Sequence, residues 1–149
     1  MSYNFDPELA PMIDLLPNMD FGDPVTARAG LQEMVALMLA ELDESGINIE
    51  DISIAGPAGA PEIPVRIYAP SAKASTTAAL IYIHGGGFVV GDLDTEHAAA
   101  VSLCRDLGVV LISVDYRLAP ETPFPGGLED CYATLAWVHA NAIELNVDS

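Results

Sequence analysis

Basic residues are scarce in this sequence: five lysines and arginines stand against 22 aspartates and glutamates, for a formal net charge of −17. A surface so acidic repels phosphate backbones and anionic headgroups, which argues against nucleic acid and against a membrane as partners. No apolar stretch approaches the roughly 20 residues that cross a bilayer. The opening residues also lack the basic start and apolar run of a secretory signal. We therefore expect a soluble, cytoplasmic protein.

Cysteine is nearly absent as well, since Cys104 and Cys131 are the only two. Each lies in an apolar helical pattern, and neither forms a C-x-x-C pair or has a histidine at ligand spacing. Both are expected to be buried free thiols. Neither a structural metal nor a cofactor is implied.

Apolar residues, by contrast, are plentiful: 51% of the 149 residues are hydrophobic and only 18% are charged. That composition argues against disorder and suffices for one packed domain. Two helices are expected first. One opens at Asp6-Pro7 and has apolar residues at helical spacing as far as Leu16, and the other opens at Asp23-Pro24 and ends at Gly46.

From Ile47 onward the spacing of the apolar residues changes to a period of two. An antiparallel pair is expected, with an acidic bend in its first strand, followed by two apolar runs typical of strands covered on both faces. The expected strands are 47–54, 63–68, 78–83 and 109–114, and the expected helices are about 95–107 and 127–145. The last helix is expected to bury Leu128, Cys131, Leu135 and Val138. Strands that alternate with helices predict an α/β fold with a largely parallel sheet.

Three consecutive glycines follow the run 78–83, in the segment His84-Gly85-Gly86-Gly87-Phe88. Glycine lets the backbone turn sharply and leaves its N–H groups unobstructed by side chains. A fixed pair of such donors can hold the oxygen that becomes negative when an ester carbonyl is attacked. The loop is therefore a candidate oxyanion hole.

Glycine loops also bind phosphate groups, so nucleotide binding is the alternative. A P-loop needs a lysine after its glycines, and the only lysine, Lys73, precedes them. A dinucleotide fingerprint needs Gly or Ala where Val90 stands, and its acidic residue would be Asp106, inside a helix instead of at a strand end. Both departures disfavour a nucleotide.

Two further motifs accompany the loop: Gly91-Asp92 just beyond it, and DYRLAPE at 115–121 followed by Phe124-Pro125. Together with HGGGF they resemble the hormone-sensitive-lipase-like family of α/β-hydrolase esterases, whose HGGG element belongs to the oxyanion hole. The resemblance covers roughly residues 63–149, and the two N-terminal helices resemble the family's cap segment. It implies an incomplete α/β-hydrolase fold, with residues 1–46 as an N-terminal helical cap segment and 47–149 as the N-terminal half of the hydrolase domain.

The resemblance also implies roles for residues of the loop. Gly86 and Gly87 would donate the N–H groups of the oxyanion hole. Gly85 and His84 would support the loop, His84 through side-chain hydrogen bonds and not as the catalytic base.

Residues outside the glycines receive roles in the same way. Phe88 and Phe21 would line the acyl pocket, although core packing explains either ring equally well. The polar residues of DYRLAPE would brace the loop region; they are Asp115, Tyr116, Arg117 and Glu121. His97 and His139 fall outside the motifs, and a surface or packing role is expected for both.

No nucleophile motif is present. The fold carries its serine in G-x-S-x-G, and none of the eight serines has glycine at both −2 and +2. A substitute triad of Ser113, His84 and Asp115 is disfavoured, because Ser113 lies within an apolar strand. The closing residues 144–149 resemble the family's segment just before the nucleophile strand, so the chain is expected to stop roughly ten residues short of that serine.

The expected function is a carboxylic ester hydrolase, an esterase or lipase that acts through an acyl-enzyme on small-molecule esters. This chain would supply the oxyanion-hole loop without the catalytic Ser, Asp or Glu, and His. As a fragment it is expected to be inactive, and to self-associate or to pair with its missing C-terminal half. Two alternatives stay open: a non-catalytic small-molecule-binding module of the same fold, and an inactive truncated product.

Overall fold

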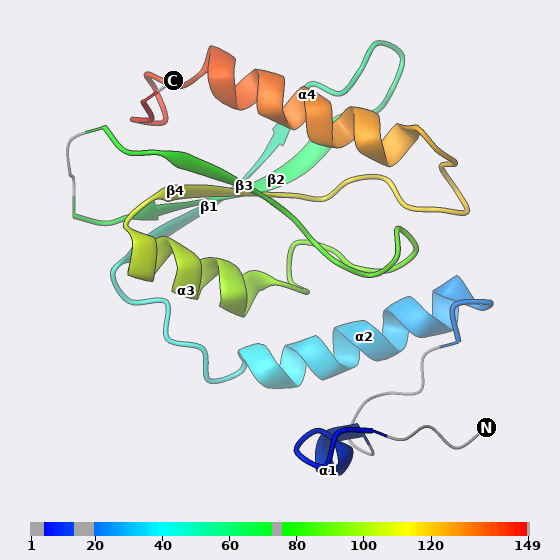
Figure 1. The fold of residues 1–149 in the computed structure, drawn as a ribbon. Coiled ribbons are helices and arrows are strands. Elements are labelled where there is room, and N and C mark those ends of the chain that lie inside the picture. Colours follow the sequence, from blue (N-terminus) through cyan, green and yellow to red (C-terminus); the bar gives the residue numbers. More distant parts are fainter. Residues whose placement is uncertain (1–4, 14–19, 73–75, 149) are drawn as a thin grey trace.

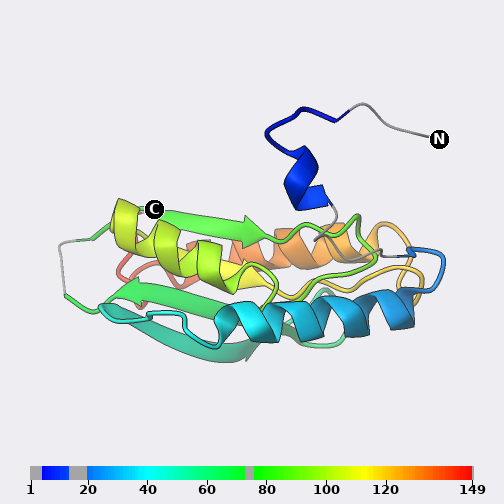
Figure 2. The ribbon, with the colours of Figure 1, turned by 90° about the horizontal axis from the view of Figure 1, so that it is seen from below.

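The computed structural model describes residues 5–13, 20–72 and 76–148. The helices are α1 (Ala10–Ile13), α2 (Pro24–Leu39), α3 (His97–Leu107) and α4 (Gly126–Ala140). The strands are β1 (Ile47–Ile54), β2 (Ile63–Pro70), β3 (Ala79–Ile83) and β4 (Val110–Val114). Figure 1 shows α4 on one face of the sheet, with α3 and α2 on the opposite side, and Figure 2 shows that α2 lies beside α3 and not over it. None of the helices among these residues is both long and apolar enough to cross a membrane.

The four strands lie in the order β1-β2-β4-β3. β2 pairs antiparallel with both β1 and β4, whereas β3 and β4 are parallel. Parallel neighbours need a crossover connection, and α3 provides it. The predicted α/β class, with an antiparallel pair joined to a parallel pair, is confirmed.

β1 contacts a different helix layer at each end. All its residues pair with β2 in one register, so the acidic bend expected at Glu50-Asp51 does not form. Ile47 and Ile49 pack in the cluster on the α3 side, whereas Ile52 and Ile54 pack in the cluster that includes residues of α4. Successive strand residues point to opposite faces of the sheet. The apolar side chains therefore move from one face to the other between Ile49 and Ile52, while the strand itself continues unbroken.

The run 78–83 has one unpaired edge, as expected for a chain that lacks the nucleophile strand beside it. β4 is buried along its whole length, but β3 is the edge of the described sheet, where Leu80 and Ile83 are 36% and 53% exposed. Natural edge strands are protected by charges, prolines or bulges. β3 contains no charged residue and no proline, so its composition is that of a strand from the middle of a sheet.

The last described residues return to the β3 side of the sheet. Thr77 and Val147 form a parallel bridge, in which the Thr77 N–H donates to the Asn146 carbonyl at 3.2 Å and the Asp148 N–H donates to the Thr77 carbonyl at 2.9 Å. After α4 the backbone thus takes the direction of a further parallel strand.

The helix ends differ from those expected. α2 ends at Leu39 instead of at Gly46, because the following segment turns and is held by α3: Arg105 donates to the carbonyl of Asp43 at 2.6 Å. α4 ends at Ala140 instead of at residue 145. Of the first expected helix, the described residues show α1, and its expected part from residue 14 to Leu16 lies outside the described residues.

Of the four residues of α4 expected to be buried, Val138 is buried and Cys131 is half-buried, but the two leucines are exposed. The buried positions are Gly126, Asp130, Thr134 and Val138, while Leu128 and Leu135 are 61% and 52% exposed. The cause is Asp130, whose fully buried carboxylate accepts three hydrogen bonds from Arg117 at 2.8–2.9 Å. A buried charge needs such partners, so the ion pair rather than the leucines sets the rotation of the helix.

Candidate active site

The glycine loop connects β3 to α3 through left-handed backbone conformations. Positive φ angles occur at Gly86 (113°), Gly87 (62°), Phe88 (65°) and Gly91 (108°). The N–H groups of Val89 and Val90 both donate to the Gly86 carbonyl at 3.1 Å, which closes a tight turn. A Cβ at Gly86 would lie 2.0 Å from the Val90 carbonyl oxygen. Only glycine fits at that position.

Three backbone donors in this turn are unused. Within the described part of the chain, the N–H groups of Gly86, Gly87 and Phe88 donate no hydrogen bond, and the first two belong to the glycines. A Cβ at Gly87 would meet no atom within 4 Å, so the space beside it is open. Fixed and unpaired N–H groups next to open space have the form that the stabilisation of an oxyanion requires.

His84 is enclosed beneath the loop. Its ring is 3% exposed and stacks on Tyr116 at 4.2 Å between centroids, and the Tyr116 hydroxyl donates to the His84 carbonyl at 3.0 Å. Nδ1 lies 2.8 Å from the Gly85 carbonyl oxygen. Since a carbonyl only accepts, Nδ1 carries the proton in this contact. Nε2 is buried and has no partner among the described residues.

Gly91-Asp92 joins the loop to the start of α3. A Cβ at Gly91 would lie 2.2 Å from Nδ1 of His84, so the histidine requires glycine there. Asp92 accepts the N–H groups of Asp94 and Thr95, each at 3.0 Å, and the Thr95 hydroxyl at 2.9 Å. Burial alone would raise the pKa of Asp92, but these bonds and one from Gln32 hold it below its ordinary value.

The polar residues of DYRLAPE all lie near the loop, and three of them form bonds that hold it in place. Tyr116 stacks on His84, Arg117 pairs with Asp130, and Glu121 pairs with Arg28 of α2 at 2.8 Å. The Ala119 N–H donates to the Phe88 carbonyl at 2.8 Å. Burial raises the pKa of Asp115, and the nearby His84 opposes that effect.

The two phenylalanines differ in their surroundings. Phe88 is 72% exposed, contacts Tyr116 at 6.4 Å between ring centroids, and lines a hollow of about 300 Å³ with Phe124 and Leu128. Phe21 precedes α2 and is 51% exposed. No recorded contact brings the two rings together.

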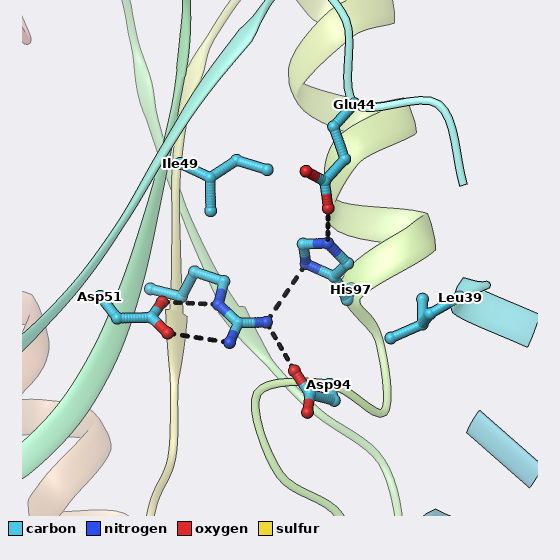
Figure 3. Close-up of a pocket in the computed structure, with 7 residues that line it drawn as sticks. Leu39, Glu44, Ile49, Asp51, Asp94 and His97 are labelled. Carbon is cyan, nitrogen blue, oxygen red and sulfur yellow. Dashed lines mark hydrogen bonds and ion pairs between the residues drawn. The ribbon is translucent and has the colours of Figure 1, made fainter. Parts of the chain in front are cut away.

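A second polar cluster lies between β1, β2 and the start of α3 (Figure 3). Arg66 contacts both carboxylate oxygens of Asp51 at 2.6 and 2.9 Å and one of Asp94 at 2.7 Å. His97 approaches Tyr68 Oη through Nδ1 and Glu44 through Nε2, both at 2.8 Å. The hydrogen bond from Arg66 lowers the pKa of Asp51, and burial raises that of Tyr68 to about 12.

This cluster surrounds a hollow of about 460 Å³ and ties α3 to the sheet and to the segment after α2. His97 therefore packs as a buried residue, 5% exposed, whereas His139 is exposed. Ser113 is 1% exposed within β4, where no substrate reaches it. Both cysteines are free thiols; Cys104 is buried as expected, whereas Cys131 is only half-buried, and burial raises the pKa of each.

Two residues that hold the site together were not identified from the sequence. Arg28 donates to the carbonyls of Val89 and Ala119 at 2.8 and 2.9 Å, and Asp130 anchors Arg117. The sequence signals were weak: Arg28 is one of only four arginines, and Asp130 stands next to a second acidic residue, Glu129, in a mainly apolar helix.

Proteins of known activity are similar to this chain. A family model of the alpha/beta hydrolase fold matches residues 80–149. The carboxylic ester hydrolase LipN of Mycobacterium tuberculosis is 42% identical over 120 residues, which cover 80% of this chain and 31% of LipN. Carboxylesterase NlhH of the same organism is 38% identical over 149 residues, which cover 97% of this chain and 45% of NlhH.

Solved structures agree with these matches. A bacterial heroin esterase superposes with a TM-score of 0.91 at 42% identity, over 96% of this chain and 45% of the esterase. An esterase of Pyrobaculum calidifontis superposes with a TM-score of 0.82 at 35% identity, over 97% and 46%. This chain thus spans less than half the length of these relatives. With its partial sheet and its glycine loop, the chain belongs to the α/β-hydrolase fold family, in the hormone-sensitive-lipase-like branch of esterases.

Proposed function

We propose that this chain forms part of a serine esterase and supplies the oxyanion hole for acyl-enzyme chemistry on small carboxylic esters. The observation that carries the proposal is the pair of unpaired N–H groups at Gly86 and Gly87, held in a turn that only glycine can form at Gly86. Several relatives that match this chain bear the names of esterases, which supports the same reaction class.

In this proposal each loop residue has a distinct task. Gly86 and Gly87 donate to the oxygen of the tetrahedral intermediate. Gly85 and His84 support them, and the enclosed ring of His84 argues against a role as the base. Phe88, exposed beside an apolar hollow, lines the acyl pocket; Phe21 would join it only if the two rings come together with substrate bound.

The division of the chain follows from the same proposal. Residues 1–46 act as the cap segment, and α2 packs against the glycine loop through the cluster of Ala27, Leu31, Val35 and Val90. Residues 47–149 act as the N-terminal half of the hydrolase domain. The parallel bridge at Thr77 and Val147 supports a further strand beside β3, and the fold carries its serine on the turn after a strand.

A cytoplasmic location and an absence of nucleic-acid or membrane partners belong to the proposal as well. Free thiols at Cys104 and Cys131 fit a reducing compartment, where disulfides are rare. The net charge of −17 opposes binding to polyanions.

Turnover is expected only when the missing catalytic groups are supplied. The 149 residues alone should hydrolyse no p-nitrophenyl butyrate, because the sequence has no G-x-S-x-G. Fused to the part of the bacterial heroin esterase that this chain does not match, they should hydrolyse it, and a serine-directed phosphonate should abolish the activity.

The outcomes separate the candidate functions. If the 149 residues alone hydrolyse the ester and the phosphonate abolishes that activity, the prediction that they lack the nucleophilic serine is wrong. A folded fusion that binds the ester without turnover favours the non-catalytic binding module.

The 149-residue chain by itself is expected to self-associate through the open edge of β3. Unpaired backbone groups and the exposed Leu80 and Ile83 form a template for another strand. Sedimentation velocity should show species larger than a monomer at tens of micromolar, and Ile83→Lys should shift them toward monomer. Leu107→Lys, at an equally exposed site at the end of α3, is the control and should not. A monodisperse wild-type monomer with a fixed near-ultraviolet circular dichroism signal contradicts this expectation.

A further inference from the structure

Arg28 joins three segments that are far apart in the sequence. From the second turn of α2, its Nε donates to the Val89 carbonyl at 2.8 Å and its Nη2 to the Ala119 carbonyl at 2.9 Å. The remaining donors form a two-point contact with Glu121, each bond at 2.8 Å. The side chain is 26% exposed. All of its contacts lie on the glycine loop or on the loop that braces it.

The contact with Val89 reaches the oxyanion donors in one further step. The Val90 N–H donates to the carbonyl of Gly86, so the peptide unit between Val89 and Val90 is held at its carbonyl by Arg28 and at its N–H by the turn. The Ala119 contact works in parallel, because the Ala119 N–H donates to the Phe88 carbonyl. Arg28 thus holds the loop directly at the Val89 carbonyl and, through Ala119, at the Phe88 carbonyl.

α2 has few other attachments that serve this purpose. One apolar stripe, Ala27, Leu31 and Val35, packs on Val90. Val25 and Leu37, elsewhere on the helix, are 73% and 81% exposed. Apolar packing is not directional, whereas charge-assisted hydrogen bonds to carbonyls fix position and angle. Gln32 of α2 adds one hydrogen bond, from Nε2 to Asp92 at 3.3 Å. Arg28 forms four bonds at 2.8–2.9 Å, two of them to backbone carbonyls, and is therefore the main directional contact of α2 with this region.

We propose that Arg28 is a positioning residue that couples α2 to the oxyanion loop, so that the placement of the Gly86 and Gly87 N–H groups depends on the docking of α2. The inference rests on the proposed function for its catalytic consequence, but the coupling itself does not require activity. Lysine cannot replace arginine fully, because one ammonium group cannot reach both carbonyls and Glu121 in the same geometry.

Hydrogen exchange of the loop amides tests the coupling on the 149-residue chain at low protein concentration. In Arg28→Met the amides of Val89 and Val90 should exchange at least about tenfold faster, the factor expected from the loss of a hydrogen bond to a charged donor. Arg28→Lys should restore part of the protection. Glu121→Gln, which keeps both carbonyl contacts, should have a smaller effect.

Arg105→Met is the matched control. Arg105 also donates to backbone carbonyls, those of Asp43 and Ser45, but at the segment between α2 and β1. Its replacement should leave exchange of the loop amides within about threefold of wild type, about the change expected where no direct hydrogen bond is lost. If Arg28→Met does not fold, Arg28→Lys alone tests the coupling. It must still speed the exchange of the Val89 and Val90 amides without speeding that of the β4 amides.

The active fusion provides the second readout. Arg28→Met should lower kcat more than it raises KM, and Arg28→Lys should recover part of kcat. Unchanged exchange at Val89 and Val90 in a folded Arg28→Met overturns the coupling, as does faster exchange spread evenly over the loop and β4. Faster loop exchange with an inactive wild-type fusion leaves the coupling in place and counts against the proposed function instead.

Discussion

Replacing Gly86 by alanine is expected to lower kcat of the active fusion by at least about 10²-fold, the usual effect of losing one oxyanion donor. The added Cβ would lie 2.0 Å from the carbonyl oxygen of Val90, and the backbone φ of 113° is one that a side chain rarely adopts. The turn must open to relieve both, which moves the N–H groups of Gly86 and Gly87 away from the reacting oxygen. Steady-state kinetics with p-nitrophenyl butyrate measure the loss.

The neighbouring glycines provide graded controls. A Cβ at Gly85 meets only Glu96 Oε1 at an ordinary 3.8 Å, so Gly85→Ala should have a much smaller effect. Gly87→Ala has open space but a φ of 62°, which costs about 1 kcal/mol for a residue with a Cβ, so its effect should be intermediate. Equal losses at all three, with the same melting temperature, would contradict a special role for the turn at Gly86.

Replacing Asp130 by alanine is expected to destabilise the fold by about 1.5–3 kcal/mol, because it removes the buried acceptor of three hydrogen bonds from Arg117, whose side chain is 27% exposed and is hydrated in part. Asp130 is completely buried and accepts from the backbone N–H, Nε and Nη2 of Arg117. Arg117 follows Tyr116 directly, so the same change should also loosen the stacking on His84. Urea denaturation of the fusion, followed by circular dichroism, measures the free energy of unfolding.

Asp106→Ala supplies the comparison, since this carboxylate lies exposed on α3. Its replacement should change the free energy of unfolding by no more than about 0.5 kcal/mol. A loss below about 1 kcal/mol for Asp130→Ala would mean that Arg117 finds another partner and that the ion pair does not set the rotation of α4.

The positions where prediction from sequence went wrong share one physical feature. In β1, the apolar side chains move from one face of the sheet to the other, and the sequence analysis interpreted this as a bend. The spacing of apolar residues along one strand does not say which helix covers each face. In α4, Leu128 and Leu135 were assigned to the core, but the partner of Arg117 took that place. Each depends on a partner more than ten residues away in the sequence.

The same distinction applies to the candidate site. The glycine run, its place after an apolar strand and its N–H groups follow from short-range chemistry, because only glycine tolerates the φ angles at Gly86 and Gly91 beside their neighbours. The residues that hold the loop were assigned in part by resemblance, such as Tyr116 and Glu121. Arg28 was missed because an arginine on a helix has no local pattern that distinguishes a surface charge from a buried contact.

The sequence by itself determined the order of helices and strands, the α/β class and the left-handed turn of the glycine loop, since these depend on the apolar period and on the conformational freedom of glycine. The tertiary structure alone decided which charges meet, through Arg28 with Val89 and Ala119, Arg117 with Asp130, and Arg66 with Asp51. The open edge of β3, by contrast, was expected from the resemblance and is present in the described sheet. The reason that only the fold decides which charges meet is the separation of the interacting residues along the sequence. A backbone turn depends on neighbouring residues, whereas an ion pair or a strand pairing depends on which distant residues the packed fold brings within a few ångströms.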